Sequence, residues 1–504
     1  MRMLRLTTLA VAVTTALAGC SLAPTYHPPQ TAVPAQYKEI GDWQPAKPAD
    51  AASRGDWWRE YHDSTLDQLV AGLDQANPTL AEALSHYDES QALEQQAQSY
   101  LLPTLNLGGY DTQSTNFYNK PHVFQSESQQ SFGHQKPSNY TEQFGGLELS
   151  YELDLWGRVR NMVAEGKAQS EAAAADLESV RLSLRASLAD NYISLRGLDA
   201  QVQLLNDVVV AYQKALTLTE DRYRGGIDSA MDVSRARAQL DSAQAELSDL
   251  AASRALYEHA IATLVGKPAS GFSLAPGELS LALPVQPLGV PSQLLQRRPD
   301  IASAERQMAA ANAGIGVARA AYYPTIMLGG FTGAYAVNSQ QLAMAPMGIW
   351  SIGPSALLNV FDAGRRRAIN RQAKDQMDIA AAQYRATVLG AFQQVEDNLA
   401  LLNHLAKESK HVNEAVKDTN KTLSIAMNRY REGMVNYLEV VTAQTAALRA
   451  QLLGINIRVR RLQADVNLVK ALGGGYQAPE HGEKMTKPTP TPAPDTAHFD
   501  NAMS

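Results

Sequence analysis

The sequence has one thiol and no long apolar segment beyond its N-terminus. A single cysteine among 504 residues excludes an intramolecular disulfide, and no apolar run after the first 20 residues is long enough for a membrane-spanning helix. The ten histidines show no metal-ligand spacing such as HExxH. The glycine-rich run GGFTGA at 329–334 is not followed by the Lys-Ser or Lys-Thr of a phosphate loop. These absences predict a chain that is not an enzyme and has neither a metal nor a soluble cofactor.

The charge and the first twenty residues predict where the protein works. A formal net charge of −7 and a pI near 5.9 argue against nucleic acid as a partner. Two arginines precede an apolar run at 6–18, which is typical of a secretory signal. The signal ends in Leu-Ala-Gly-Cys, which resembles the lipobox of bacterial lipoproteins; we expect a covalent lipid on Cys20, and a chance cysteine is the alternative. Ser21 follows, where an Asp would retain a lipoprotein at the inner membrane, so we expect the outer membrane.

Proline is absent from two long stretches, 138–267 and 355–478. A proline inside a helix costs roughly 3 kcal/mol, so only such stretches can hold very long helices. The sequence from 164 onward is rich in Ala, Leu, Glu and Arg, with apolar residues three and four positions apart. We therefore predict two long helical regions that pack through faces of leucine and alanine.

The chain is also an internal duplication. A shift of 207 positions places RYRGGID at 222–228 on RYREGMV at 429–435. Upstream the shift becomes 221, because the first copy contains an extra loop of about 14 residues, and LPTLNLGG at 102 then meets YPTIMLGG at 323. The predicted boundaries are a signal peptide at 1–19, a lipidated extended segment at 20–64, a first repeat at 65–266, a Pro-rich connector at 267–291, a second repeat at 292–475 and a disordered Pro/Thr-rich tail at 476–504.

Each repeat is predicted to contain a helix, a β-hairpin and a long helical hairpin. Amphipathic helices are expected at 79–100 and 300–321, each ended by a Pro-Thr pair. The clearest strand is LELSYELDL at 147–155, with one apolar and one acidic face; its counterpart from Trp350 to Val360 alternates less cleanly because Pro354 interrupts it as an edge or bulge residue would.

Strands of about ten residues suit a tilted crossing of an outer membrane, and aromatic residues near the strand ends favour this over a soluble sheet with one buried face. Four strands cannot close a barrel, and an open edge in lipid leaves backbone groups without partners. The chain must then oligomerise, and a dimer, trimer or tetramer with 8, 12 or 16 strands all remain open.

After each β-hairpin the sequence enters a long helix. The stretch from Gly157 to Tyr223 corresponds to about 100 Å of helix. It ends at Gly225 and Gly226, a returning helix is expected at about 228–265, and the second copy repeats this around Gly433. The RYRxG phrase is therefore predicted to form the tip of a helical hairpin, with glycine ending the helix and arginines in its last turn, where the helix dipole favours cations.

This pattern resembles the TolC and OprM family of outer membrane factors, in the NodT-like lipoprotein branch. The motifs are WW at 57, NPTLAEA at 77, QRRPDIASAE at 296, FDAGRRR at 361 and the paired RYRxG tips. The resemblance implies an α+β, TolC-like membrane protein: a homotrimer with a 12-stranded outer-membrane barrel and a periplasmic tunnel of long helices. It also implies a periplasmic adaptor and an inner-membrane pump, commonly of the resistance-nodulation-division class, and export of small molecules such as drugs.

The resemblance also implies which residues serve the tips. We expect the adaptor to dock on a surface formed by Arg222, Tyr223, Gly226, Arg429, Tyr430 and Gly433. We expect the periplasmic gate to contain Asp232, Tyr430 and Glu439, with Asp232 bonded to Tyr430. The family has an Arg five residues after that Tyr, but Val435 stands there, so its ionic link is either missing or supplied by another residue such as Arg431. Alternatively, Asp232 and Glu439 only cap or solvate helix ends.

Two other functions would fit parts of the sequence. A type I secretion duct for proteins would share this architecture. A lipid-anchored periplasmic coiled-coil scaffold would keep the helices without a pore, although it would have no reason for four alternating strands.

Overall fold

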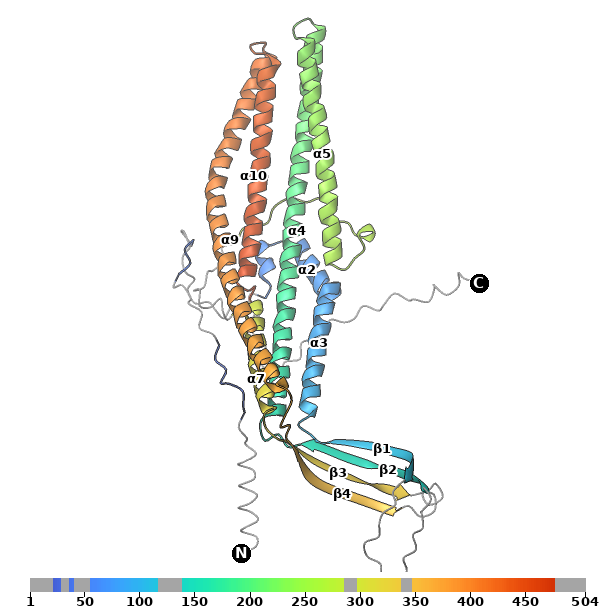
Figure 1. The fold of residues 1–504 in the computed structure, drawn as a ribbon. Coiled ribbons are helices and arrows are strands. Elements are labelled where there is room, and N and C mark those ends of the chain that lie inside the picture. Colours follow the sequence, from blue (N-terminus) through green and yellow to red (C-terminus); the bar gives the residue numbers. More distant parts are fainter. Residues whose placement is uncertain are drawn as a thin grey trace, which may run out of the picture. The chain divides into compact units, whose positions relative to one another are not determined.

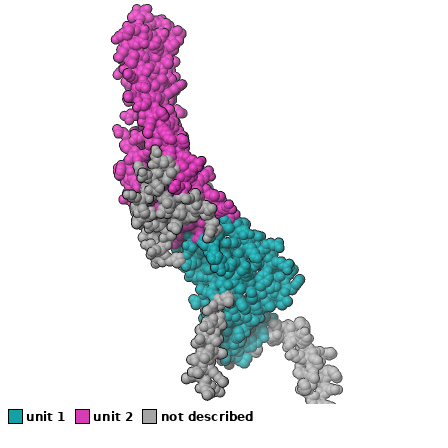
Figure 2. Space-filling model, turned by 90° about the vertical axis from the view of Figure 1, so that its left-hand side faces the viewer, with its two compact units in different colours: residues 1–28, 89–171, 306–381 teal, residues 29–88, 172–305, 382–504 magenta. Residues whose placement is uncertain are grey.

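A computed structural model of the chain describes residues 21–28, 36–39, 55–116, 138–284, 297–336 and 347–475. The predicted signal, Cys20, most of the extra loop and the predicted tail lie outside these residues. The chain divides into two compact units (Figure 2): unit 1 comprises 1–28, 89–171 and 306–381, and unit 2 comprises 29–88, 172–305 and 382–504.

The two repeats contain the same elements in the same order (Figure 1). In the first repeat, α3 (Pro78–Ser99) leads to β1 (Thr104–Asn116), β2 (Ser138–Glu152), α4 (Arg158–Arg224) and α5 (Ala230–Leu264). In the second, α7 (Pro299–Ala320) leads to β3 (Thr325–Ala336), β4 (Met347–Leu357), α9 (Arg365–Arg431) and α10 (Tyr437–Ala471). Helices α4 and α9 both have 67 residues, and α5 and α10 both have 35. Short helices η1 (Trp57–Tyr61), α2 (Ser64–Ala76) and η2 (Ala269–Gly271) complete the described elements.

The four strands form one antiparallel sheet in unit 1, in the order β1-β2-β3-β4, as two hairpins placed side by side. The predicted strands and the two helices before them are confirmed, but the strand bounds differ. Strand β2 ends at Glu152 and not at Leu155, because the carboxylates of Glu152 and Asp154 bind Arg158 and Arg160 at the start of α4. Strand β4 ends at Leu357, and Pro354 lies on this edge strand as expected.

The core of unit 2 lies where η1 and α2 pack against α4 and α10. Trp57, Trp58 and Tyr61 are buried there, so the last part of the segment predicted as extended is helical. The hydroxyl of Tyr61 donates to Asp465 at 2.5 Å. Asp63 caps α2 by accepting hydrogen bonds from two of its first backbone amides, and it also accepts one from Tyr192 at 2.8 Å. These contacts fix the part of unit 2 from which the helical hairpins extend.

Candidate functional site at the helical tips

The two helical tips have the same backbone conformation. Gly226 and Gly433 both have φ +76°, the left-handed region that glycine favours. At the first tip, the amide of Gly226 donates to Tyr223 O at 2.9 Å and the amide of Ile227 donates to Arg222 O at 2.9 Å. The second tip repeats both bonds 207 residues later. This is the Schellman pattern of helix termination, so the RYRxG phrase forms the tip as predicted.

A polar cluster at the first tip joins the two helical hairpins of the chain. We call Thr219, Arg222, Asp228 and Tyr430 the tip cluster. Arg222 forms a two-pronged ion pair with Asp228, with Nε and Nη2 at 2.9 and 3.1 Å from the two carboxylate oxygens. The Tyr430 hydroxyl from the second hairpin donates to the same carboxylate at 2.5 Å and lies 2.9 Å from Thr219 Oγ1. Arg222 Nη1 also donates to Tyr430 O at 3.1 Å, and its guanidinium lies 4.6 Å from the Tyr430 ring centroid.

The cluster fixes the protonation of its members. Burial favours the neutral form of Asp228, but the hydrogen bonds from Arg222 and Tyr430 and the charge of Arg222 outweigh burial and lower the pKa of this carboxyl. Burial and the bond to Asp228 raise the pKa of the Tyr430 hydroxyl. The bond to Asp228 raises the pKa of Arg222. At neutral pH the cluster therefore contains a carboxylate, a guanidinium and a neutral tyrosine.

Within the chain, Tyr430 bonds Asp228 and not Asp232, the acid expected from the sequence. Asp232 is the third residue of α5, where it forms a capping box with Ser229: the Asp232 amide donates to Ser229 Oγ at 3.2 Å, and the Ser229 amide donates to Asp232 Oδ2 at 3.3 Å. Asp228, four residues earlier in the turn, is the acid that reaches the second hairpin. The ionic link comes from Arg222, and Arg431, the substitute considered from the sequence, forms no ion pair within the described residues.

Burial also corrects the expected docking surface. Tyr223 is 49% exposed, and Gly226, Arg429 and Gly433 are exposed as well. Arg222 has a side chain only 13% exposed, and Tyr430 is fully buried, so neither presents a surface in this chain. Glu439 is exposed in the first turn of α10, where no described residue pairs with its carboxylate.

Sequence reasoning missed an apolar surface at the tips. Four large apolar side chains beside the tip glycines are 46–67% exposed. They are Ile227, Met231, Met434 and Leu438. The signal was present in the sequence, since turns are commonly polar, yet Ile227 and Met434 follow the tip glycines directly and Met231 and Leu438 come five residues after them.

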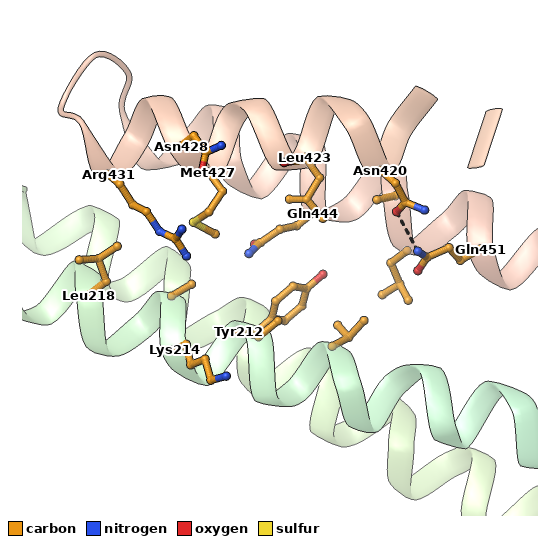
Figure 3. Close-up of a pocket in the computed structure, with 16 residues that line it drawn as sticks. Tyr212, Lys214, Leu218, Asn420, Leu423, Met427, Asn428, Arg431, Gln444 and Gln451 are labelled. Atoms are coloured by element: carbon orange, nitrogen blue, oxygen red, sulfur yellow. Dashed lines mark hydrogen bonds between the residues drawn. The ribbon is translucent and has the colours of Figure 1, made fainter. Parts of the chain in front are cut away.

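Behind the tip cluster the hairpins are separated by a cavity of about 440 Å³ between α4 on one side and α9 and α10 on the other. Arg431, Gln444 and Tyr212 point into this gap (Figure 3). Gln444 is 3% exposed, and its Oε1 has no hydrogen-bond partner among the described residues. The tip cluster therefore joins two hairpins that are not tightly packed immediately behind it.

Other kinds of site receive no support from the described part of the chain. No group of three His, Cys, Asp or Glu residues there could hold a metal ion. No helix there is long and apolar enough to cross a membrane.

Comparison with known proteins identifies the family. The model of the family described as "Outer membrane efflux protein" matches residues 69–267 and 290–474. The probable efflux pump outer membrane protein TtgC of Pseudomonas putida is 31% identical over 462 residues, which cover 91% of this chain and 93% of that protein. The outer membrane protein OprJ of Pseudomonas aeruginosa is 29% identical over 469 residues, which cover 93% and 95%.

Solved structures agree with these relatives. The outer-membrane channel OprN superposes with a TM-score of 0.82 at 30% identity, covering 90% of this chain and 99% of that one. VceC from Vibrio cholerae superposes with a TM-score of 0.76 at 28% identity, covering 84% and 100%. The predicted TolC-like fold is confirmed, and with it the expectation of a channel and not an enzyme. The chain belongs to the outer membrane efflux protein family, whose members are outer-membrane channels of efflux pumps.

Proposed function

We propose that this chain is the exit duct of a tripartite efflux system and that it works as a homotrimer. The observation that carries the proposal is the four-stranded sheet with two open edges, β1 and β4. Unpaired backbone groups at these edges cost several kcal/mol each in lipid, so the sheet is completed by strands of other copies. Three copies give the 12-stranded barrel that the family resemblance implies.

The substrates we propose are small organic compounds. Relatives at 29–31% identity are described as antibiotic, toluene and solvent efflux pump outer membrane proteins. Selectivity is expected to reside mainly in the pump, which we infer to be of the resistance-nodulation-division class.

The proposed adaptor-docking surface combines the exposed residues at the tips. Tyr223, Gly226, Arg429 and Gly433 are joined there by the four exposed apolar side chains. An exposed apolar group at the tips of the helical hairpins favours a protein partner. We infer that this partner is the periplasmic adaptor.

A lipid on Cys20 is the proposed anchor. The residues that follow it are tied to unit 1, which also contains the sheet. Ser21 Oγ donates to Asn161 at 3.0 Å, and Arg319 Nη1 donates to Leu22 O at 3.1 Å. This attachment supports an anchor in the same membrane as the sheet.

The tip cluster is the proposed lock of a closed periplasmic gate. It joins the first and second hairpins of a chain through hydrogen bonds to a charged group. Each such hydrogen bond contributes roughly 1.5–3 kcal/mol to stability. Three copies would repeat it around the duct. In this proposal, Asp228 is the acid that bonds Tyr430, and Asp232 and Glu439 add negative charge near the tips of the helical hairpins.

Two measurements on the purified protein test the proposal: its conductance in planar bilayers and the mass of its oligomer in detergent. A trimer that conducts ions supports the duct. A protein that never conducts would instead be a scaffold. A trimer that is required for secretion of a protein substrate, but not for resistance to small toxic compounds, would be a type I secretion duct.

A further inference from the structure

The two faces of the sheet have opposite chemistry. The strand register places Leu105, Leu107, Leu147, Leu149, Trp350 and Ile352 on one face. The other face carries Glu142, Glu148 and Glu152 on alternate residues of β2. Carboxylates are costly in lipid, so in the proposed barrel the acidic face lines the lumen.

Three of the aromatic rings on this acidic face contact one another in a row, one from each of three adjacent strands. Tyr110 of β1 stands opposite Phe144 of β2, and their rings stack with centroids 5.6 Å apart at 29°. Phe331 of β3 meets the edge of the Phe144 ring, with centroids 6.2 Å apart at 88°. Tyr110 is 51% exposed and Phe331 is 42% exposed. We call these three residues the aromatic row.

Two glycines give the middle ring its position. Gly146 and Gly333 are paired across β2 and β3, on the same face as the aromatic row. A Cβ on Gly146 would lie 2.9 Å from Phe144 Cζ, and a Cβ on Gly333 would lie 3.0 Å from Phe144 Cε2. The ring of Phe144 therefore lies down over the strands toward Phe331, in space that only glycine leaves open.

One carboxylate beside the aromatic row has no partner in the part of the chain that the structure describes. Glu148 is exposed and stands opposite Phe331 in the register of β2 and β3, and no described residue bonds to it. The other two acids of this face are engaged: Glu152 binds Arg158, and Glu142 accepts a hydrogen bond from Tyr335 at 3.0 Å. The row thus combines open ring surface with one free negative charge.

We propose that the aromatic row and Glu148 form a binding site for flat aromatic cations. Ring faces attract both aromatic surface and positive charge, and the carboxylate supplies the ion pair. This inference depends on the proposed function in one respect: the site faces the lumen only if the sheet forms part of the proposed barrel. In a trimer, three copies would then offer three sites to compounds that pass through the duct. The inference assigns a substrate class, amphiphilic organic cations, to a barrel interior that is otherwise polar.

Ethidium binding to the full-length protein in detergent, followed by fluorescence, tests the site without requiring conduction. We expect Glu148→Gln and Phe331→Leu each to weaken binding by about fivefold, the scale of one lost ion pair or cation–π contact. Glu142→Gln is the matched control, since it removes the same charge from the same face outside the row, and it should bind as wild type does. Equal loss in Glu142→Gln and Glu148→Gln would mean that only the general charge of the face matters, and unchanged binding in both Glu148→Gln and Phe331→Leu would also overturn the proposal.

Conductance separates this inference from the proposed function. In a conducting trimer, ethidium should reduce the current, and Glu148→Gln should require about fivefold more ethidium for the same block. Binding that depends on Glu148 in a protein that never conducts would leave the site in place and overturn the duct. A conducting trimer whose ethidium block and binding ignore Glu148 would leave the duct in place and overturn the site.

Discussion

Tyr430 is the residue on which the contact between the two helical hairpins depends most. Its hydroxyl is buried and shared between Asp228 and Thr219. Tyr430→Phe removes the donor to a carboxylate, which costs roughly 1.5–3 kcal/mol, and leaves the ring in place. We expect a higher resting conductance in planar bilayers.

The duplication provides the control for this substitution. Tyr223 occupies the matching position of the first repeat, but it is 49% exposed, and its hydroxyl forms no hydrogen bond with the described residues. Tyr223→Phe should conduct as wild type does. Equal conductance of Tyr430→Phe and wild type would show that Tyr430 is only a packing residue.

The pKa shifts of the tip cluster predict how the lock depends on pH. The lowered pKa of Asp228 means that its contribution to stability is complete above the ordinary pKa of an aspartate, about 4, and is lost as the pH falls through the lower folded value. The raised pKa of Tyr430 means that its contribution is complete below about 10 and is lost at higher pH. Resting conductance should therefore be lowest between these limits and rise below pH 4.

Asp228→Asn tests whether Asp228 causes the expected rise in conductance below pH 4. Its conductance should be high at neutral pH and change little on acidification, because the titrating group is gone. A variant that keeps the wild-type rise below pH 4 would assign that rise to another acid.

The sequence could identify Tyr430 of the proposed gate but not the acid that it bonds. Spacing from the tip glycine and the family resemblance selected Tyr430, which does join the hairpins, and Asp232, which does not. Asp228 and Asp232 lie four residues apart, and their roles differ only because α5 begins between them and uses Asp232 in its capping box. The spacing of Ser229 and Asp232 is the sequence pattern of a capping box, and it is the signal that could have separated the two acids.

At the scale of elements, the internal duplication made the fold predictable. The constant offset of 207 residues predicted that corresponding helices of the two hairpins have equal lengths, and α4 and α9 are equal in length. The duplication is not exact at the tips, because Val435 stands where the first repeat has Asp228. Arg222 is therefore buried in an ion pair, while its counterpart Arg429 stays exposed. Strand bounds were less predictable, because β2 ends where its last residue, Glu152, and Asp154 beyond it bind the first arginines of α4.

The tip glycines offer a clean test of the helical turn. No atom lies within 4 Å of a Cβ built on Gly226, so Gly226→Ala adds no clash, and its cost of about 1 kcal/mol comes from the left-handed backbone alone. Its neighbour Gly225 has no positive φ and would tolerate alanine. We expect Gly226→Ala to lower the midpoint of denaturant unfolding and to reduce export, and Gly225→Ala to do neither. Equal effects of both substitutions would place the constraint elsewhere in the turn.

At the scale of the whole molecule, the proposed lipid anchor and the sheet would provide two independent attachments to the membrane. Cys20→Ser removes the sulfur that a lipid thioether needs, so palmitate labelling should disappear. The protein should nevertheless stay in the outer membrane fraction through its barrel. Labelling that survives this substitution would contradict the lipobox.

The sheet itself can be tested by two substitutions at neighbouring positions. Leu107 lies on the apolar face and is 81% exposed in the single chain, while Asn106 points to the acidic face opposite Glu148. An arginine on the lipid side of a barrel costs about 2–4 kcal/mol near the middle of the bilayer, and each copy would add its own cost in a trimer. Leu107→Arg should therefore deplete the protein from the outer membrane fraction, whereas Asn106→Arg, with water and a carboxylate beside it, should insert as wild type does. The sequence predicted this difference from alternation alone, but alternation fits a soluble sheet equally well, since it reports only that one face avoids water. If Asn106→Arg blocked insertion while Leu107→Arg did not, the faces would be reversed, and the aromatic row would then meet lipid and not the lumen.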